Sequence, residues 1–287
     1  MNAAILRQLL KADPYAQVDD AAERQKLVVG NWKMHGSLAL CREAIPALAR
    51  SVSPEVQLVL CPPAPFLGEV ARLAQGTAVQ YSGQDVAEQQ SGARTGEWSA
   101  GMLAELGCRY TLVGHSERRQ HHYEDDALIA AKARACQDAG ITPIVCIGES
   151  EAERERGETA QVLYNQLDWL MTTPLWRQAI VAYEPRWAIG TNHPATPELA
   201  QQTHALIRAY LAQTDAVAAA KIPLLYGGSV KADNAAGFMA MPDIDGVLVG
   251  GASLDTASFL EIYASAVLCG SEHRPVQQLA QLARMVA

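Results

Sequence analysis

The sequence lacks the cysteine patterns that bind metals or catalyse disulfide exchange. Its six cysteines form no Cys-x-x-Cys pair and no cluster with histidines at zinc-binding spacing. Most of them lie beside apolar residues, which predicts buried, reduced thiols, and such thiols are typical of a reducing cytoplasm. These cysteines are Cys41, Cys61, Cys108, Cys136, Cys146 and Cys269.

Long apolar runs are also missing. No stretch approaches the roughly 20 apolar residues of a membrane-spanning helix, and residues 1–25 contain no apolar core of a signal peptide. The acidic residues of that segment argue against an organelle transit peptide. We therefore expect a soluble protein that stays in the cytoplasm, without a membrane partner.

An excess of positive charge is absent too. The formal net charge is −8, whereas a surface that follows nucleic-acid phosphates needs a basic stripe. We therefore expect no nucleic-acid partner. A small anionic substrate is compatible with this charge, because a few local donors outweigh a diffuse negative field.

No linker rich in proline, glycine or serine divides the 287 residues, and no low-complexity segment occurs. We expect one domain over residues 26–270, preceded by an extension of residues 1–25 and followed by an extension of residues 271–287. A chain of this length can bury a sizeable core without disulfides.

Eight short apolar runs, each bounded by turn residues, recur along this domain. Their near-continuous apolar character predicts strands that are buried on both faces. The runs are Leu27–Gly30, Val56–Cys61, Ala78–Gln84, Tyr110–Gly114, Thr142–Ile147, Ala179–Tyr183, Pro223–Tyr226 and Gly246–Val249.

Helical patterns lie between several of these runs. Ala39–Arg50 has helical apolar spacing that Pro46 interrupts, and Ala127–Gly140 ends in the glycine typical of a helix C-terminus. Pro197–Gln213 follows Thr196, a candidate N-cap. Strands that alternate with helices indicate a parallel sheet, and eight such units over about 240 residues predict a closed (β/α)8 barrel. An open, doubly wound sheet would need a glycine-rich turn after the first strand, where the sequence instead reads NWKMHG.

In such a barrel the functional residues follow the carboxyl ends of the strands. Asn31 and Lys33 follow the first predicted strand, His115 and Glu117 the fourth, and Glu184 the sixth. An ammonium, an imidazole and a carboxylate should therefore face one mouth, without a cysteine–histidine pair or a cluster of metal ligands. We predict a site that uses no metal and no cofactor.

Glycine turns follow the last two predicted strands. Gly228 and Ser229 follow the seventh, and Gly250 and Gly251 follow the eighth. In barrels of this type such turns hold a phosphate through backbone N–H groups, because glycine lets the backbone approach the anion. A single carboxylate can take a proton from carbon beside a carbonyl if nearby donors stabilise the enediolate. The set predicts proton transfer between adjacent carbons of a phosphorylated carbonyl compound.

Six segments of the chain resemble the triosephosphate isomerase family. They are NWKMHG, GHSERR, CIGE, YEPRWAIGT, YGGSV and LVGGASL, and they stand in the family's order and at compatible spacing between about residues 26 and 266. The resemblance implies an isomerase of glycolysis and gluconeogenesis. It would interconvert dihydroxyacetone phosphate and D-glyceraldehyde 3-phosphate by glutamate-mediated proton transfer through an enediolate.

The resemblance also implies a role for each polar residue of the mouth. Glu184 would be the base, and His115 would polarise the carbonyl from the start of a helix whose dipole disfavours an imidazolium. Lys33 would hold the substrate electrostatically, and Asn31 would orient the enediolate. Glu117 matches the family's carboxylate beside the lysine, and for this residue a structural and a catalytic role are equally open.

The phosphate site and a lid follow from the same resemblance. Donors to the phosphate would come from Gly190, Ser229, Gly250 and Gly251, with Gly228 shaping the turn. The lid would comprise Pro185, Arg186, Trp187, Ala188, Ile189, Gly190, Thr191 and Asn192, and it would close so that the enediolate does not lose its phosphate.

The residues that would contact the lid, and the lid positions that differ from the family, can also be compared. Tyr226 and Ser229 resemble the residues that hold the lid closed, and Glu149 resembles the partner of Trp187 in the open state. Arg186 stands where a small aliphatic residue is usual, and Asn192 stands where glycine is common; asparagine tolerates left-handed backbone angles.

Residues 92–98 resemble the loop through which the family forms dimers. Thr95, which would reach into the partner's site, is retained, whereas Arg94 and Trp98 replace an aromatic and an aliphatic residue. We expect a homodimer whose only other ligands are small phosphorylated trioses.

Two other functions are compatible with the pattern. One is an isomerase of a four-carbon keto-phosphate with the same proton-transfer residues, against which the intact AIGT lid tip argues. The other is a catalytically silent barrel that acts as a binding or scaffold protein, which would predict loss of Lys33, His115 or Glu184.

Overall fold

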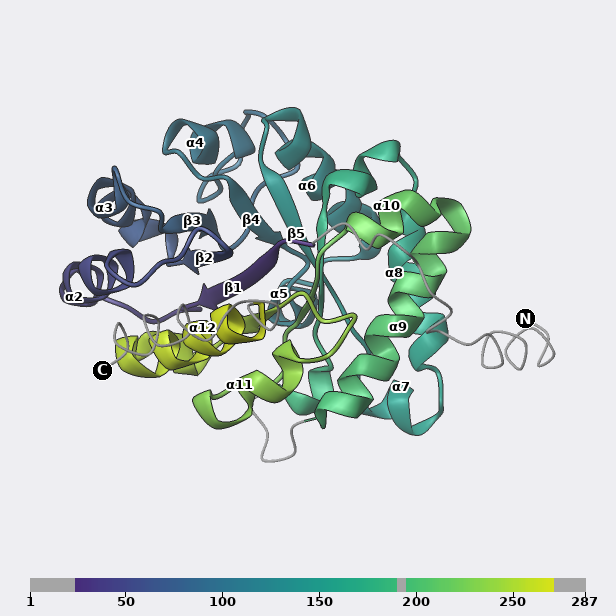
Figure 1. Ribbon diagram of the computed structural model, residues 1–287. Helices are drawn as coiled ribbons and strands as arrows, with labels where there is room; N and C mark the ends of the chain where they lie inside the picture. The colour runs from purple at the N-terminus through teal and green to yellow at the C-terminus, as the bar shows by residue number, and fades with distance from the viewer. Residues whose placement is uncertain (1–23, 190–194, 271–287) are drawn as a thin grey trace.

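Eight parallel strands form a closed barrel in the computed structural model, which describes residues 24–189 and 195–270. Each strand pairs with its neighbours in the sequence, and β8 pairs with β1, so that the barrel has no free edge (Figure 1). The predicted (β/α)8 barrel is confirmed. The strands are β1 (Lys26–Asn31), β2 (Val56–Cys61), β3 (Gln80–Gly83), β4 (Tyr110–Val113), β5 (Thr142–Ile147), β6 (Ile180–Tyr183), β7 (Leu224–Tyr226) and β8 (Gly246–Val249).

Helices surround the strands (Figure 1). The α-helices are α2 (Leu38–Ala49), α3 (Ala64–Ala74), α4 (Ala100–Glu105), α5 (Ser116–His121), α6 (Asp126–Asp138), α7 (Glu151–Glu155), α8 (Thr159–Leu170), α9 (Pro197–Thr214), α10 (Ala216–Lys221), α11 (Ala232–Met239) and α12 (Thr256–Gly270). Three short 3-10 helices are η1 (Pro174–Gln178), η2 (Arg186–Ala188) and η3 (Gly251–Leu254).

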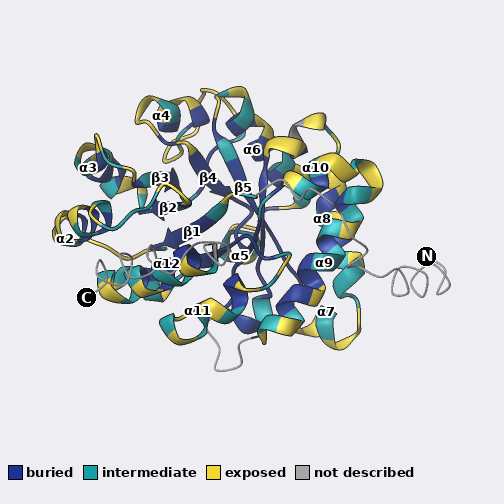
Figure 2. Ribbon diagram, in the orientation of Figure 1, coloured by how far each residue is buried: buried dark blue, intermediate teal, exposed yellow. Residues whose placement is uncertain are grey.

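Side chains of each strand alternate between two apolar clusters. In β1, Leu27 and Val29 belong to a cluster that also contains Ile144 and Leu248 from other strands, whereas Val28 belongs to the larger cluster shared with the helices. This alternation is the two-residue period of a strand. Because both faces are buried, the strands form the dark centre of the molecule in Figure 2, and exposed residues lie on the outer elements.

The element boundaries agree with the sequence patterns within about two residues, with one difference in kind. Helix α2 continues through Pro46, which the sequence pattern treats as an interruption. A proline removes one backbone N–H and strains its turn, but the helix is held on the barrel by buried residues on both sides, among them Cys41 and Leu48. Packing therefore outweighs the local cost.

Two helix termini form as predicted. The Thr196 hydroxyl caps α9 by accepting from the Leu199 N–H at 3.3 Å. Gly140 follows α6 with φ +75°, the left-handed conformation that glycine adopts without cost.

The cysteines also agree with the prediction, since all six are free thiols and all except the partly exposed Cys269 are buried. Within residues 24–189 and 195–270, no helix is long and apolar enough to cross a membrane. Residues 1–23 and 271–287, which make up nearly all of the two expected extensions, lie outside the described part of the chain.

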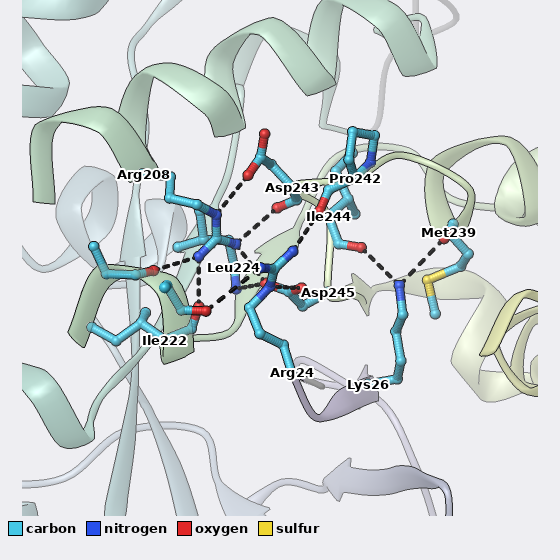
Figure 3. A network of polar contacts seen from close by, with 12 residues as sticks. Arg24, Lys26, Arg208, Ile222, Leu224, Met239, Pro242, Asp243, Ile244 and Asp245 are labelled. Atoms are coloured by element: carbon cyan, nitrogen blue, oxygen red, sulfur yellow. Dashed lines mark hydrogen bonds and ion pairs between the residues drawn. The ribbon is translucent and has the colours of Figure 1, made fainter. Parts of the chain in front are cut away.

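One buried carboxylate joins the beginning of the chain to the last two strands. Asp245, 1% exposed, lies just before β8. It accepts from Arg24 Nε at 2.6 Å, from Arg208 of α9 at 2.8 Å and from the Leu224 N–H at 2.9 Å (Figure 3). Arg208 also donates to Asp243 at 2.6 Å. Removal of this side chain would take one acceptor from each of these donors, and the Leu224 N–H would lose the acceptor that it has here.

We expect Asp245→Ala to lower the free energy of unfolding by about 1–3 kcal/mol, because the change leaves the buried Leu224 N–H without an acceptor and removes the carboxylate that Arg24 and Arg208 share. Urea denaturation of the full chain measures this. Glu158→Ala is the matched control, since its ion pair with Arg156 is exposed on both sides and should contribute little. Equal effects of the two variants would contradict the structural importance of Asp245.

Candidate active site

A cavity of about 640 Å³ opens at the carboxyl ends of the strands. It brings together residues that follow five different strands, as the sequence predicted for a barrel mouth. Its lining includes Asn31, Lys33, His115, Glu184, Gly228, Ser229, Gly250 and Gly251. The predicted ammonium, imidazole, carboxylate and glycine turns therefore share one space.

Glu184 directly follows β6 and is only 3% exposed. Its two carboxylate oxygens face different donors: Oε1 lies 2.9 Å from His115 Nε2, and Oε2 accepts from the Ser116 N–H at 2.9 Å. Burial raises the pKa of this carboxyl group, but His115, Ser116 and Lys33 together lower it more, so that the net shift is downward. The side chain is therefore an ionised carboxylate at neutral pH.

Two glycines make room for Glu184. A Cβ on Gly148 would lie 1.9 Å from the Glu184 carbonyl oxygen, and a Cβ on Gly227 would lie 2.9 Å from Glu184 Cγ. Gly148 follows β5, and β5 pairs with β6 up to Ile147↔Tyr183. The close approach of the two backbones thus sets the position of the carboxylate.

His115 is the N-cap of α5 and is buried. Its Nδ1 accepts from the Glu117 N–H at 3.2 Å, which only an unprotonated Nδ1 can do, so that the proton lies on Nε2 beside Glu184. Burial lowers the pKa of His115, and the facing carboxylate raises it to a value above the ordinary one. That upward shift lasts only while Glu184 carries its charge.

Lys33 adopts a left-handed backbone conformation with φ +52°, which is strained for a residue with a side chain. Asn31 Oδ1 accepts from the Lys33 N–H at 2.9 Å, and Gln84 Nε2 donates to the Lys33 carbonyl at 2.8 Å. The ammonium lies 2.6 Å from Glu117 Oε1. These contacts aim the lysine side chain into the mouth of the barrel.

The contacts of Gln84, Ser116 and Gly148 were not predicted from the sequence. Gln84 ends the third apolar run but joins Lys33 only through the fold, and Ser116 acts through its backbone N–H. Their residue types therefore carried no signal. The segments GHSERR and CIGE contain Ser116 and Gly148 and so pointed to these two positions, whereas no segment pointed to Gln84.

The lid is described as far as Ile189. Pro185 precedes η2, which contains Arg186, Trp187 and Ala188, and Ile189 lines the cavity. Gly190, Thr191 and Asn192 lie outside the described residues.

Glu149 contacts the described part of the segment predicted to be a lid. Trp187 Nε1 donates to Glu149 Oε1 at 2.9 Å, which is the contact that the resemblance implied, and Tyr183 donates to the same oxygen at 3.0 Å. Arg154 lies over the Trp187 ring, 4.1 Å from its centroid.

A groove of about 670 Å³ lies beside the cavity described above and shares Asn31, Lys33 and His115 with it. Met34, which lines this groove, is 94% exposed. Thr95 is an exposed residue of the loop 92–98 and lines neither the cavity nor the groove.

A buried charge cluster unforeseen in the sequence borders the groove. Lys132 donates to Asp85 at 2.8 Å and to Glu124 at 2.6 Å, and Arg118 bonds the same two carboxylates at 2.9 and 2.6 Å. Two cations thus neutralise two buried anions, so that removing one member would leave a buried charge without its partner.

Within the described part of the chain, no three histidine, cysteine, aspartate or glutamate side chains gather closely enough to hold a metal ion. The residues of the cavity instead suit a small anion with an oxygen that can take developing negative charge. A buried carboxylate paired with an imidazole, at the mouth of a (β/α)8 barrel, is an arrangement for proton transfer.

Comparison with known proteins agrees with this class. A model of the triosephosphate isomerase family matches residues 26–266. The triosephosphate isomerase of Thiobacillus denitrificans (strain ATCC 25259 / T1) is 51% identical over 246 residues, which cover 85% of this chain and 99% of the relative. That of Bordetella pertussis (strain Tohama I / ATCC BAA-589 / NCTC 13251) is 50% identical over 250 residues, with coverage of 85% and 99%. The chain belongs to the triosephosphate isomerase family, and the predicted family and enzyme class are confirmed.

We expect Gly148→Ala to lower the free energy of unfolding by about 3 kcal/mol or more, since its methyl group would force the β5 and β6 ends apart. Gly68→Ala is the matched control. Gly68 lies in α3 with no atom within 4 Å of the added Cβ, so alanine should raise stability by about 0.5–1 kcal/mol. Denaturant titration that found both changes harmless would contradict the close approach.

Proposed function

We propose that this chain interconverts dihydroxyacetone phosphate and D-glyceraldehyde 3-phosphate by proton transfer through an enediolate. The observation that carries the proposal is the buried Glu184 carboxylate 2.9 Å from His115 Nε2, inside a cavity that also exposes Lys33 and two glycine turns. The relatives named triosephosphate isomerase support the choice of substrate.

Glu184 is the proposed base. A carboxylate that accepts from two donors is a weak base, so it must leave the Ser116 N–H and His115 to reach a substrate carbon. It then takes the proton from C1 of dihydroxyacetone phosphate and returns it to C2 of the enediolate. No other group needs to store that proton, and no metal or cofactor enters the step.

His115, Lys33 and Asn31 are the proposed electrophiles and positioning groups. When Glu184 becomes protonated by the substrate, the negative charge that raised the pKa of His115 disappears. A neutral imidazole can then donate from Nε2 to the enediolate oxygens and exchange protons between them. The Lys33 ammonium stabilises the developing charge, and the Asn31 side chain keeps the strained lysine backbone in place.

Glu117 is proposed to act on Lys33. Its carboxylate lies 2.6 Å from the Lys33 ammonium and is considerably more exposed than Glu184. This position suits a residue that holds the lysine. We therefore favour a structural role for Glu117 over a catalytic one.

The phosphate is proposed to lie between the last two glycine turns. Ser229, Gly250 and Gly251 would donate backbone N–H groups, together with Gly190, and Gly228 would let the turn approach the anion. Closure of residues 185–192 would exclude water, with Tyr226 and Ser229 holding the closed lid and Glu149 holding Trp187 in the open one.

The cellular setting is also a proposal. We infer a role in glycolysis and gluconeogenesis, in the cytoplasm, where the five buried free thiols would stay reduced. Residues 26–270 would be the single catalytic domain, and residues 1–25 and 271–287 would be its extensions.

A homodimer would explain the groove beside the active site. Met34 is almost fully exposed there, and the groove shares Lys33 and His115 with the catalytic cavity. An inserted loop of a second copy, carrying Thr95, would cover Met34 and close the groove. Dimer formation would then shape the active site.

The first test of the activity is turnover of D-glyceraldehyde 3-phosphate in a coupled assay. The wild-type chain should turn over, and Glu184→Ala should lose about 100- to 10,000-fold in kcat, the usual contribution of an acid–base group. Glu261→Ala, an exposed position on α12, should leave kcat unchanged. A folded wild-type chain without turnover would refute the triose substrate and direct the assay to four-carbon keto-phosphates.

The dimer is tested by sedimentation. The wild-type chain should sediment with twice the mass of one chain. Thr95→Glu should shift it toward the monomer, because the added carboxylate would be desolvated in the partner's groove, where Lys33 and Arg118 are already paired with carboxylates. Thr214→Glu, which places the same charge at the exposed end of α9, is the control. A monomeric wild type would overturn the proposal.

A further inference from the structure

We propose that Asn234 is a positioning residue for phosphate binding, acting through the turn 228–230. Asn234 lies in the first turn of α11, and the sequence patterns did not single it out. The inference rests on the proposed function, in which Ser229 donates to the substrate phosphate.

The Asn234 amide group spans the turn from one side. Its Nδ2 donates to the Ser229 carbonyl at 3.1 Å, and its Oδ1 accepts from the Lys231 N–H at 2.8 Å. The Asn234 and Ala235 N–H groups both donate to the Lys231 carbonyl, at 3.2 and 3.0 Å. The turn between Ser229 and Lys231 is thereby joined to the helix at three points.

The N–H groups of this turn are left for another acceptor. Among the described residues, the backbone N–H groups of Gly228, Ser229 and Val230 have no hydrogen-bond partner. All three residues line the cavity that contains Glu184 and Lys33. Successive unpaired N–H groups form a concave site that attracts anions.

Asn234 fixes the orientation of the peptide between Ser229 and Val230. The carbonyl and N–H of one peptide unit point in opposite directions. Because Asn234 binds the Ser229 carbonyl, the peptide between Ser229 and Val230 cannot rotate without breaking that bond. Rotation would carry the carbonyl oxygen toward the side on which the Val230 N–H now lies. A carbonyl oxygen facing a phosphate would repel it, so the Asn234 bond keeps the Val230 N–H available as a donor. The Ser229 N–H belongs to the preceding peptide, between Gly228 and Ser229, and Asn234 acts on it only through the shared residue Ser229.

The same side chain also caps α11, and the two roles can be separated. Asn234→Ala removes both hydrogen bonds. Asn234→Asp keeps an acceptor for the Lys231 N–H but has no donor for the Ser229 carbonyl at neutral pH. A residue that only caps the helix would be replaced well by aspartate, whereas a positioning residue would not.

The experiment measures binding of inorganic phosphate to the full chain by calorimetry, at low and high salt, beside KM and kcat for D-glyceraldehyde 3-phosphate. Asn234→Ala and Asn234→Asp should both weaken phosphate binding about tenfold, a change of about 1.4 kcal/mol, and raise KM more than they lower kcat. High salt screens the added charge of aspartate. The affinity of Asn234→Asp for phosphate should still be lower than that of the wild-type chain at the same high salt concentration. Asn165→Ala, an exposed asparagine on α8, is the matched control and should bind as wild type does.

Two outcomes would overturn the inference. One is wild-type phosphate affinity in Asn234→Ala, and the other is full restoration of that affinity in Asn234→Asp, which would leave only a capping role. If the alanine variant does not fold, the phosphate affinity of the aspartate variant alone tests the inference. If the wild-type chain binds phosphate, the Asn234 variants weaken that binding and no triose is turned over, the proposed activity is refuted and this inference stands.

Discussion

Pairing of β1 with β8 is the interaction on which the rest of the structure depends. It runs from Leu27↔Gly246 to Gly30↔Val249, and it requires a glycine, because a Cβ on Gly246 would lie 2.0 Å from the Leu27 carbonyl oxygen. Asp245, which immediately precedes β8, accepts hydrogen bonds from Arg208 and Arg24. Closing the barrel here places the ends of the first and last strands side by side, so that the Lys33 side chain after β1 lies beside Gly250 after β8.

The catalytic cavity follows from closure together with a few close approaches. Strand ends that would lie far apart in an open sheet converge, and a carboxylate, an imidazole and an ammonium meet in a buried space. Such a set is costly unless every charge has a partner. Glu184 has two donors, and Lys33 has Glu117. The site is therefore stable without substrate, and the carboxylate that we propose as the base would have to exchange these contacts for a substrate carbon.

Much of this arrangement could be predicted from local patterns. The eight apolar runs mark the strands, and the rule that functional residues follow the strand ends correctly predicts that Asn31, Lys33, His115 and Glu184 line one cavity. Contacts between distant segments could not be predicted in this way. Gln84 on the Lys33 carbonyl and Asn234 on the turn at Ser229 depend on which segments become neighbours in space. Glutamine and asparagine occur throughout the chain, so their residue types give no warning of these contacts.

The fold class, the family and the residue types of the site follow from local sequence, because strand burial, turn chemistry and strand-end position are properties of short segments. The folded chain adds which oxygen of Glu184 faces His115, which nitrogen of His115 carries its proton, and how the strained Lys33 is held. It also decided that α2 continues through Pro46, because packing against the barrel outweighs the lost hydrogen bond. These outcomes depend on distances between segments far apart in the chain, and such distances exist only after the barrel has closed.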